Sequence, residues 1–278
     1  MEAHSTHHDV WEAEAGKPPA EPAGLADLWR RPLPEMAGRP LRRFCCRALA
    51  SVGRSWLESA PDWKQIHPAN DPFILTPNHS SRLEALLLPA LLAIHRNGRQ
   101  VHFLADWNYL LWPLLGSLIR MNDPIIVTRK PARPAFLNRF KPLFQTAESP
   151  YAQARRRLLA GQSLGIFPEG TVNPRSRSLL LGQSGAARLS LETGAAIIPM
   201  GIQFTGRPAG FLNLDSMIVR LGRPLRPSAD HLGSTAPAAA VRQWHETTMR
   251  AIAALSGKTW STLNPRNNHA PADSSLAN

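Results

Sequence analysis

The chain has 278 residues, 43% of them hydrophobic and 19% charged, so it can fold around a core of its own and is not disordered as a whole. Its 32 basic and 20 acidic residues give a net charge of +12, which favours an anionic partner: nucleic acid, a membrane surface or a phosphorylated substrate. Cys45 and Cys46 are the only cysteines, which excludes a disulfide scaffold and a four-cysteine zinc site and makes a reducing cytoplasm the expected compartment. No uncharged apolar run reaches the roughly 20 residues of a membrane-spanning helix, and the acidic N-terminal stretch is not a secretory signal.

Both ends of the chain are expected to be tails. Residues 1–38 carry scattered prolines without a periodic apolar face, and residues 257–278 are rich in Asn, Pro, Ser and Ala. Such composition is typical of mostly disordered segments. We therefore predict one domain over residues 39–256, with an N-terminal amphipathic helix as its first element.

That first element, Pro40–Glu58, has apolar residues at spacings of three and four. Its other positions carry Arg42, Arg43, Arg47 and Arg54. Two interpretations remain open: the apolar side packs on the domain, with the arginines in solvent, or the helix lies on an anionic membrane surface.

Short β-like runs alternate with helical stretches through the rest of the domain. The expected strands are Phe73–Thr76, Val101–Ala105, Ile125–Thr128, Leu164–Phe167, Ile197–Ile202 and Met217–Leu221. The expected helices are Arg82–His95, Pro150–Ala160, Ser184–Thr193 and Pro237–Leu255. This alternation predicts an α/β fold with a mixed, largely parallel sheet flanked by helices. Ligands of such sheets lie beyond the carboxyl ends of the strands, here the loops after Thr76, Thr128 and Phe167.

The first of these loops contains a candidate general base. His79 follows the first strand and can take a proton from a hydroxyl, and a carboxylate can hold it in the required tautomer. Positions five apart in a helix do not face each other, so His79 must lie in the turn and Glu84 in the first turn of the helix. Ser81 and Glu84 also fit a capping box, which would leave Glu84 only a structural role.

The other two loops carry basic residues. Arg129 and Lys130 follow the third strand, and Arg175 and Arg177 follow the Phe167–Thr171 stretch. A guanidinium matches the oxygens of a phosphate. Each arginine taken alone fits a solvated surface position better, but three loops directed at one crevice together favour a binding site.

With these blocks in view, the chain resembles the glycerolipid acyltransferases of the bacterial lysophosphatidate acyltransferase type. That family carries Asn-His-x-Ser-x-x-Asp, an apolar strand ending in Arg, Phe-Pro-Glu-Gly-Thr, and a later apolar run with a central Pro. The corresponding segments here are Asn78–Glu84, Ile125–Arg129, Phe167–Thr171 and Ile197–Met200, in the same order. The similarity covers roughly Phe73 to Leu225.

The resemblance implies an O-acyltransferase that moves a fatty acyl group from acyl-CoA or acyl-ACP to the hydroxyl of a lyso-lipid, with 1-acylglycerol-3-phosphate as the first candidate. His79 would remove the hydroxyl proton and Glu84 would orient His79. The acceptor head would be bound by Arg129, Glu169, Gly170, Thr171, Arg175 and Arg177, and backbone N–H groups there would face the oxyanion. No metal or cofactor is implied. We expect a cytoplasmic enzyme bound peripherally to the inner face of the cell membrane.

Several positions depart from the family pattern. Glu84 replaces the family's Asp, and Val172–Pro174 intervene before Arg175, where an Arg usually follows the motif directly. Asp106 stands where a basic residue is usual. These departures leave two alternatives open: an amine-containing lyso-lipid as acceptor, or a member that binds lipid without turnover. A nucleic-acid binder would explain the charge but not the His79 and Phe167–Thr171 blocks, so nucleic acid is not an expected partner.

Overall fold

The computed structural model describes residues 24–59, 62–132, 134–173, 177–204 and 217–262. Its seven strands form one sheet in the order β1-β7-β6-β2-β5-β3-β4. The strands are β1 (Leu57–Ser59), β2 (Phe73–Pro77), β3 (Val101–Asp106), β4 (Ile125–Val127), β5 (Ser163–Gly165), β6 (Ala196–Phe204) and β7 (Met217–Leu221). Neighbouring strands run parallel except β6 and β7, which confirms the predicted mixed, largely parallel sheet.

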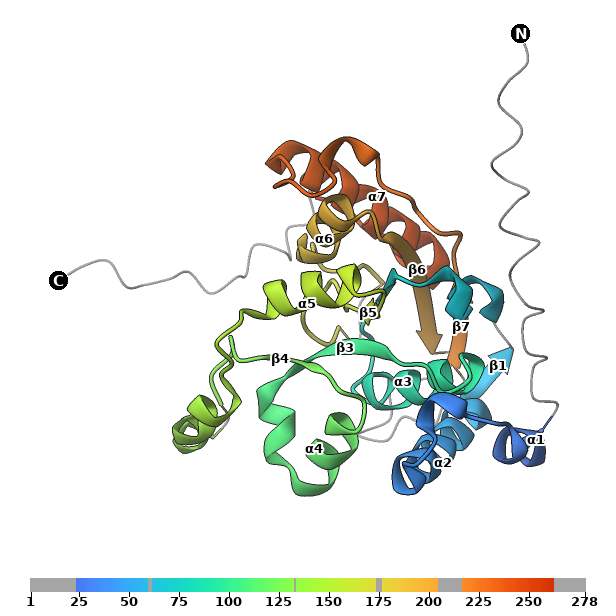
Figure 1. Cartoon of the computed structure of the whole chain (residues 1–278). Coiled ribbons are helices and arrows are strands. Elements are labelled where there is room, and N and C mark those ends of the chain that lie inside the picture. The colour runs from blue at the N-terminus through green and yellow to red at the C-terminus, as the bar shows by residue number, and fades with distance from the viewer. Residues whose placement is uncertain (1–23, 60–61, 133, 174–176, 205–216, 263–278) are drawn as a thin grey trace, which may run out of the picture.

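Helices cover both faces of this sheet (Figure 1). The α-helices are α1 (Leu25–Arg30), α2 (Pro40–Trp56), α3 (Glu84–His95), α4 (Pro113–Arg120), α5 (Pro150–Leu159), α6 (Gly185–Thr193) and α7 (Ala238–Ser256). The 3-10 helices are η1 (Pro34–Met36), η2 (Trp63–Ile66), η3 (Pro68–Asn70), η4 (Trp107–Leu111), η5 (Ala135–Phe144) and η6 (Ala229–His231). None of the helices described is long and apolar enough to cross a bilayer.

The core has one part on each face of the sheet. Successive side chains of a strand point to opposite faces, so Phe73 and Leu75 of β2 pack with α2 and α3, whereas Ile74 packs with α5 and α6. Helix α7 lies so close to β6 that a Cβ atom on Gly201 would meet the backbone of Leu255 at 2.2 Å. This close contact holds the C-terminal end of α7 beside the central strands.

Both predicted tails are wrong in the residues that the structure describes. Residues 24–38 form α1 and η1, and their side chains Leu28, Leu33 and Met36 are buried in the α2–α3 side of the core. Residues 257–262 continue from α7, with Thr259 pairing with Ser178. The remaining residues of both predicted tails, 1–23 and 263–278, lie outside the described part of the chain.

Helix α2 confirms the predicted amphipathic helix, but only part of its apolar side is buried. Cys46 and Ala50 are buried against α3, whereas Leu41, Phe44 and Val52 are exposed. The sequence did not predict β1, α1 or α4, because short elements give too few residues for a periodic pattern to be recognised.

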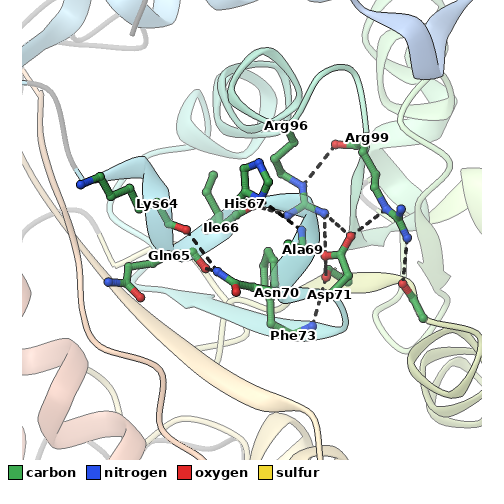
Figure 2. A network of polar contacts seen from close by, with 12 residues as sticks. Lys64, Gln65, Ile66, His67, Ala69, Asn70, Asp71, Phe73, Arg96 and Arg99 are labelled. Atoms are coloured by element: carbon green, nitrogen blue, oxygen red, sulfur yellow. Dashed lines mark hydrogen bonds and ion pairs between the residues drawn. The ribbon is translucent and has the colours of Figure 1, made fainter. Parts of the chain in front are cut away.

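A buried ion pair ties together the amino-terminal edge of the sheet (Figure 2). The guanidinium of Arg96, at the end of α3, donates to both carboxylate oxygens of Asp71 at 2.7 and 2.8 Å, and Arg99 contacts the same carboxylate at 2.7 Å. Asp71 also accepts from the Ser163 hydroxyl at the start of β5, whose oxygen accepts from the backbone N–H of Phe73. The network therefore fixes the starts of β2 and β5 against the end of α3.

Breaking this pair should destabilise the fold strongly. Arg96→Met leaves the Asp71 carboxylate buried without its main partner, and we expect a loss of about 3–5 kcal/mol in the free energy of unfolding, measured by urea denaturation. The matched control is Arg250→Met, which removes an exposed pair with Glu246 on α7 and should cost less than about 1 kcal/mol. Equal losses in the two variants would contradict a structural role for the Asp71 pair.

Candidate active site

A cleft of about 1780 Å³ opens at the carboxyl edge of the sheet. Because β2, β3, β4, β5 and β6 run in the same direction, the loops that follow them meet at this edge. His79 after β2, Arg129 after β4 and Gly170 after β5 all line this cleft. The structure thus brings together the three loops that the sequence singled out.

The His79 ring faces this cleft and bonds to Glu84. The two side chains meet at 2.8 Å between Nδ1 and Oε1. A carboxylate acceptor places the ring proton on Nδ1, which leaves Nε2 as the basic nitrogen; no protein partner for Nε2 occurs among the described residues. The ring also stacks on Phe167, with centroids 4.3 Å apart.

Glu84 is buried at the first position of α3, two residues after the predicted helix start. Its side chain is 0% exposed, and Oε1 also accepts from the backbone N–H of Ser80. Burial raises the pKa of the Glu84 carboxyl, while the bonds from His79, Ser81 and Ser80 oppose that shift. Glu84 therefore does more than begin a helix: it fixes the ring of His79 and the backbone that follows it.

Asn78 holds the loop on the sheet. Its Oδ1 accepts from the backbone N–H of Ile202 at 2.6 Å, and its Nδ2 donates to the Ile202 carbonyl at 2.9 Å. A side-chain amide thus continues the pairing of β2 with β6 beyond the end of β2. This anchor sets the direction in which His79 leaves the sheet.

Glu169 joins the loop of His79 to the loop after β5. It is 5% exposed, and its two oxygens accept from the His79 backbone N–H at 3.0 Å, from Asn173 Nδ2 at 2.8 Å and from the Leu180 backbone N–H at 3.0 Å. The backbone N–H of Asn173 in turn donates to the His79 carbonyl at 2.7 Å. The family resemblance implied that Glu169 binds the acceptor head. In the structure, both carboxylate oxygens of Glu169 instead accept hydrogen bonds from protein donors.

Only some of the residues predicted to bind the acceptor head line the cleft. Arg129, Gly170, Thr171 and Arg177 line the cleft with His79, and Arg129 and Arg177 are exposed there. Arg175 lies outside the described residues. The backbone N–H of Gly170, expected to face an oxyanion, donates instead to the carbonyl of Phe167 at 3.1 Å.

Two residues that line the cleft, Lys258 and Asp106, were not predicted as site residues from the sequence. Lys258, from the predicted C-terminal tail, donates from Nζ to Ser80 Oγ at 3.0 Å. Burial lowers the pKa of the Lys258 ammonium, while the carboxylates of Glu169 and Glu84 oppose that shift. Asp106, at the end of β3, also lines the cleft and was noted only as a departure from the family pattern.

The sequence around Lys258 gives only weak evidence that this residue belongs to a site. It follows Gly257, which has a φ of +65° and ends α7, as glycine commonly does. Nothing in the sequence indicates that the next residue reaches Ser80, 178 positions earlier.

The cleft also has an apolar lining large enough for a lipid chain. Its apolar residues come from β3, α3, the loop after β5 and α6, and include Leu86, Pro89, Phe103, Leu104, Ile166 and Leu189. Its ionic residues are Arg82, Arg129, Lys130, Arg177 and Lys258, with Asp106 the single acidic residue lining it among those described. No group of three or more potential metal ligands occurs in the described part of the chain.

Comparisons with known proteins show the family to which this chain is related. The family model Acyltransferase matches residues 62–203. A lyso-ornithine lipid O-acyltransferase of Brucella abortus is 27% identical over 65% of this chain and 58% of its own length. One of Rhizobium meliloti is 28% identical over 49% of this chain and 42% of its own length. The chain therefore spans only about half the length of these relatives.

The fold is also similar to that of a solved structure. It is the 1-acyl-sn-glycerophosphate (LPA) acyltransferase PlsC of Thermotoga maritima, with a TM-score of 0.51 and 19% identity over 81% of this chain and 86% of that chain.

Replacing Glu169 should loosen the site. In Glu169→Gln an amide N–H group would face backbone N–H donors, so we expect a loss of about 1–3 kcal/mol in the free energy of unfolding, measured in urea. Glu148→Gln, which weakens an exposed pair with Arg156, is the matched control and should cost less than about 1 kcal/mol. If Glu169→Gln is as stable as the wild type, its three hydrogen bonds do not brace the loops.

Proposed function

Because this chain belongs to the acyltransferase family, we propose that it transfers a fatty acyl group from a thioester, acyl-CoA or acyl-ACP, to the hydroxyl of a lyso-lipid. The observation that carries the proposal is the 2.8 Å contact between His79 Nδ1 and Glu84 Oε1, in a cleft with both apolar and basic linings. This pair provides a general base next to space for a lipid. It also argues against a member of the family that binds lipid without turnover.

The reaction follows from these groups. The acceptor oxygen attacks the thioester carbon while its proton moves to His79 Nε2, and the carbonyl π electrons move onto oxygen. The tetrahedral intermediate then collapses, the C–S bond breaks, and the leaving sulfur takes the proton from His79. Glu84 stabilises the imidazolium between the two steps. Every bond change is accounted for without a metal, a cofactor or a covalent acyl-enzyme.

We propose an ornithine-bearing lyso-lipid as the acceptor, with lysophosphatidate as the second candidate. The activity for which the Brucella and Rhizobium relatives are named supports the first, whereas the Thermotoga structure, at 19% identity, supports the fold alone. Ornithine brings a side-chain ammonium as well as an acidic group. The cleft is lined by five cations, which would pair with the acidic group, and by Asp106, which would pair with the ornithine ammonium. Lysophosphatidate has no cation that could pair with Asp106.

We further propose that the enzyme sits on the cytoplasmic, anionic face of the cell membrane. Large exposed apolar side chains occur on α1, on α2 and at the start of α4, and these three helices lie along the lower side of the molecule in Figure 1. They include Trp29 on α1, Leu41 and Phe44 on α2, and Trp112 and Leu114 at the start of α4. Basic residues Arg30 in α1, Arg39 just before α2 and Arg120 in α4 are exposed and would contact anionic lipid heads.

The activity proposal is tested by product analysis. Purified protein is incubated with an acyl thioester and a panel of lyso-lipids, and the products are identified by mass spectrometry. We expect a diacyl product from the ornithine-bearing lyso-lipid, and a loss of about 10²–10⁴ in rate for His79→Ala, since the general base is removed. Near-normal activity of a folded His79→Ala variant would contradict the mechanism.

The same assay resolves the role of Glu84. Glu84→Gln should slow turnover strongly, because a neutral amide stabilises the imidazolium less well, whereas Glu84→Asp, the residue usual in the family, should be tolerated. A fully active Glu84→Gln variant would leave Glu84 only a structural role at the start of α3.

Membrane association is tested by co-sedimentation with anionic vesicles. Leu41→Gln with Phe44→Gln on α2, and separately Trp112→Gln with Leu114→Gln near α4, should each reduce binding, since each removes apolar area from the contact. High salt should reduce it further, because the Debye length shortens from about 10 Å at 0.1 M to about 3 Å at 1 M.

The matched control for this test is Leu159→Gln with Leu232→Gln, two exposed leucines outside the proposed surface. It should leave binding unchanged. Equal binding by all three double variants at low and high salt would exclude these helices as the anchor.

A further inference from the structure

Three backbone N–H groups of the loops at His79 already have protein acceptors. The N–H of His79 donates to Glu169, that of Ser80 to Glu84 and that of Gly170 to Phe167. A tetrahedral intermediate formed beside His79 carries a negative oxygen, and these three groups are not free to donate to it. Ser80, the residue that follows His79 in the chain, lines the same cleft.

The hydrogen bonds of Ser80 determine where its hydroxyl proton can point. Ser80 Oγ accepts from Asn78 Nδ2 at 2.8 Å and from Lys258 Nζ at 3.0 Å. The Asn78 amide cannot be reversed, because its oxygen accepts from the Ile202 N–H and its nitrogen donates to the Ile202 carbonyl. A lysine ammonium has only donors. Both contacts therefore occupy lone pairs of Ser80 Oγ.

A serine hydroxyl has two lone pairs and one proton. With both lone pairs taken, the Ser80 O–H remains as a donor, and no acceptor for it occurs among the described residues. Since Ser80 lines the cleft, that donor is available to a bound molecule. A cation on the oxygen makes the hydroxyl a stronger donor, because hydrogen bonds in a chain polarise one another.

Lys258 is held in place from its own backbone. Its N–H donates to the Ala253 carbonyl at 3.0 Å, and the following Thr259 N–H donates to the Arg177 carbonyl at 2.9 Å. Trp260 Nε1 donates to the Leu180 carbonyl at 3.1 Å. The segment after α7 is thus held against the loop that Glu169 joins to His79. The contact between Lys258 and Ser80 links this segment to the His79 loop as well.

We propose that Ser80 is a catalytic residue whose hydroxyl donates a hydrogen bond to the oxyanion of the tetrahedral intermediate, and that Lys258 is a positioning residue acting through Ser80. The inference rests on the proposed acyl transfer. When the acceptor oxygen bonds to the thioester carbon, the carbonyl oxygen becomes negative and the Ser80 O–H bond to it strengthens. The proton stays on Ser80 throughout, and the C–S bond breaks as before.

The test separates kcat from KM for both substrates in purified variants. Ser80→Ala should lower kcat by about 10²–10³ with little change in either KM, as expected when one oxyanion donor is lost. Ser80→Thr keeps a hydroxyl and should retain most of the rate. Lys258→Met should lower kcat by about tenfold or more, since a charged hydrogen bond is lost, and Lys258→Arg should restore part of it.

Two further variants show whether the pair acts as a unit. The double variant Ser80→Ala with Lys258→Met should be no slower than Ser80→Ala alone, because Lys258 has nothing to act through once the hydroxyl is gone. Lys64→Met removes an exposed lysine on η2, outside the cleft lining, and should leave both kcat and KM unchanged.

The outcomes are distinct. If wild type transfers acyl groups and Ser80→Ala keeps its kcat, the oxyanion role is wrong while the proposed function stands. If Lys258→Met raises KM for the acceptor and leaves kcat unchanged, Lys258 binds the acceptor head and the relay through Ser80 is wrong. If wild type transfers nothing to any lyso-lipid, the proposed function fails and this inference fails with it. Should Ser80→Ala not fold, the kcat of Lys258→Met decides.

Discussion

The site depends on one buried carboxylate. Glu169 accepts from the backbone of His79, from Asn173 and from Leu180, so three stretches of chain are fixed to one residue. A buried carboxylate left without these donors would be strongly unfavourable, which makes the arrangement of the loops all-or-none. Because the Leu180 loop also receives the segment after α7, the position of Lys258 depends on the same carboxylate.

The two edges of the sheet are built for different tasks. At the amino edge, Asp71, Arg96 and Ser163 are joined by hydrogen bonds in a buried network. At the carboxyl edge, the buried carboxylates of Glu84 and Glu169 hold backbone groups and the His79 ring, while the cleft beyond them is open. Rigid packing on one edge thus supports precise placement of a base on the other, which is a common arrangement for sites on parallel sheets.

The cleft combines two environments that a lipid substrate requires. Its apolar walls come from residues such as Phe103 and Leu189, and its charged groups come from loops at the strand ends. In the proposed reaction, His79 lies between these two environments, so the reacting hydroxyl of the lipid would lie at the boundary between its chain and its head. The exposed apolar residues of α2 and α4 would bring this boundary close to the membrane from which a lipid must enter.

The sequence by itself determined the alternation of strands and helices, the loops that meet at the cleft, and His79 with Glu84 as a candidate pair, because each depends on local periodicity or on a spacing of a few residues. It left open whether Glu84 only caps the helix, and the contact between the two side chains came from the structure. Only the tertiary structure decided that residues 24–38 belong to the core, that Glu169 turns toward protein donors, and that Lys258 reaches Ser80. These features join residues far apart in the chain, such as Ser80 and Lys258, and their contacts depend on how helices pack on the sheet. A pattern read along the chain reports which residues can be buried, but not which distant donor a buried acceptor will find.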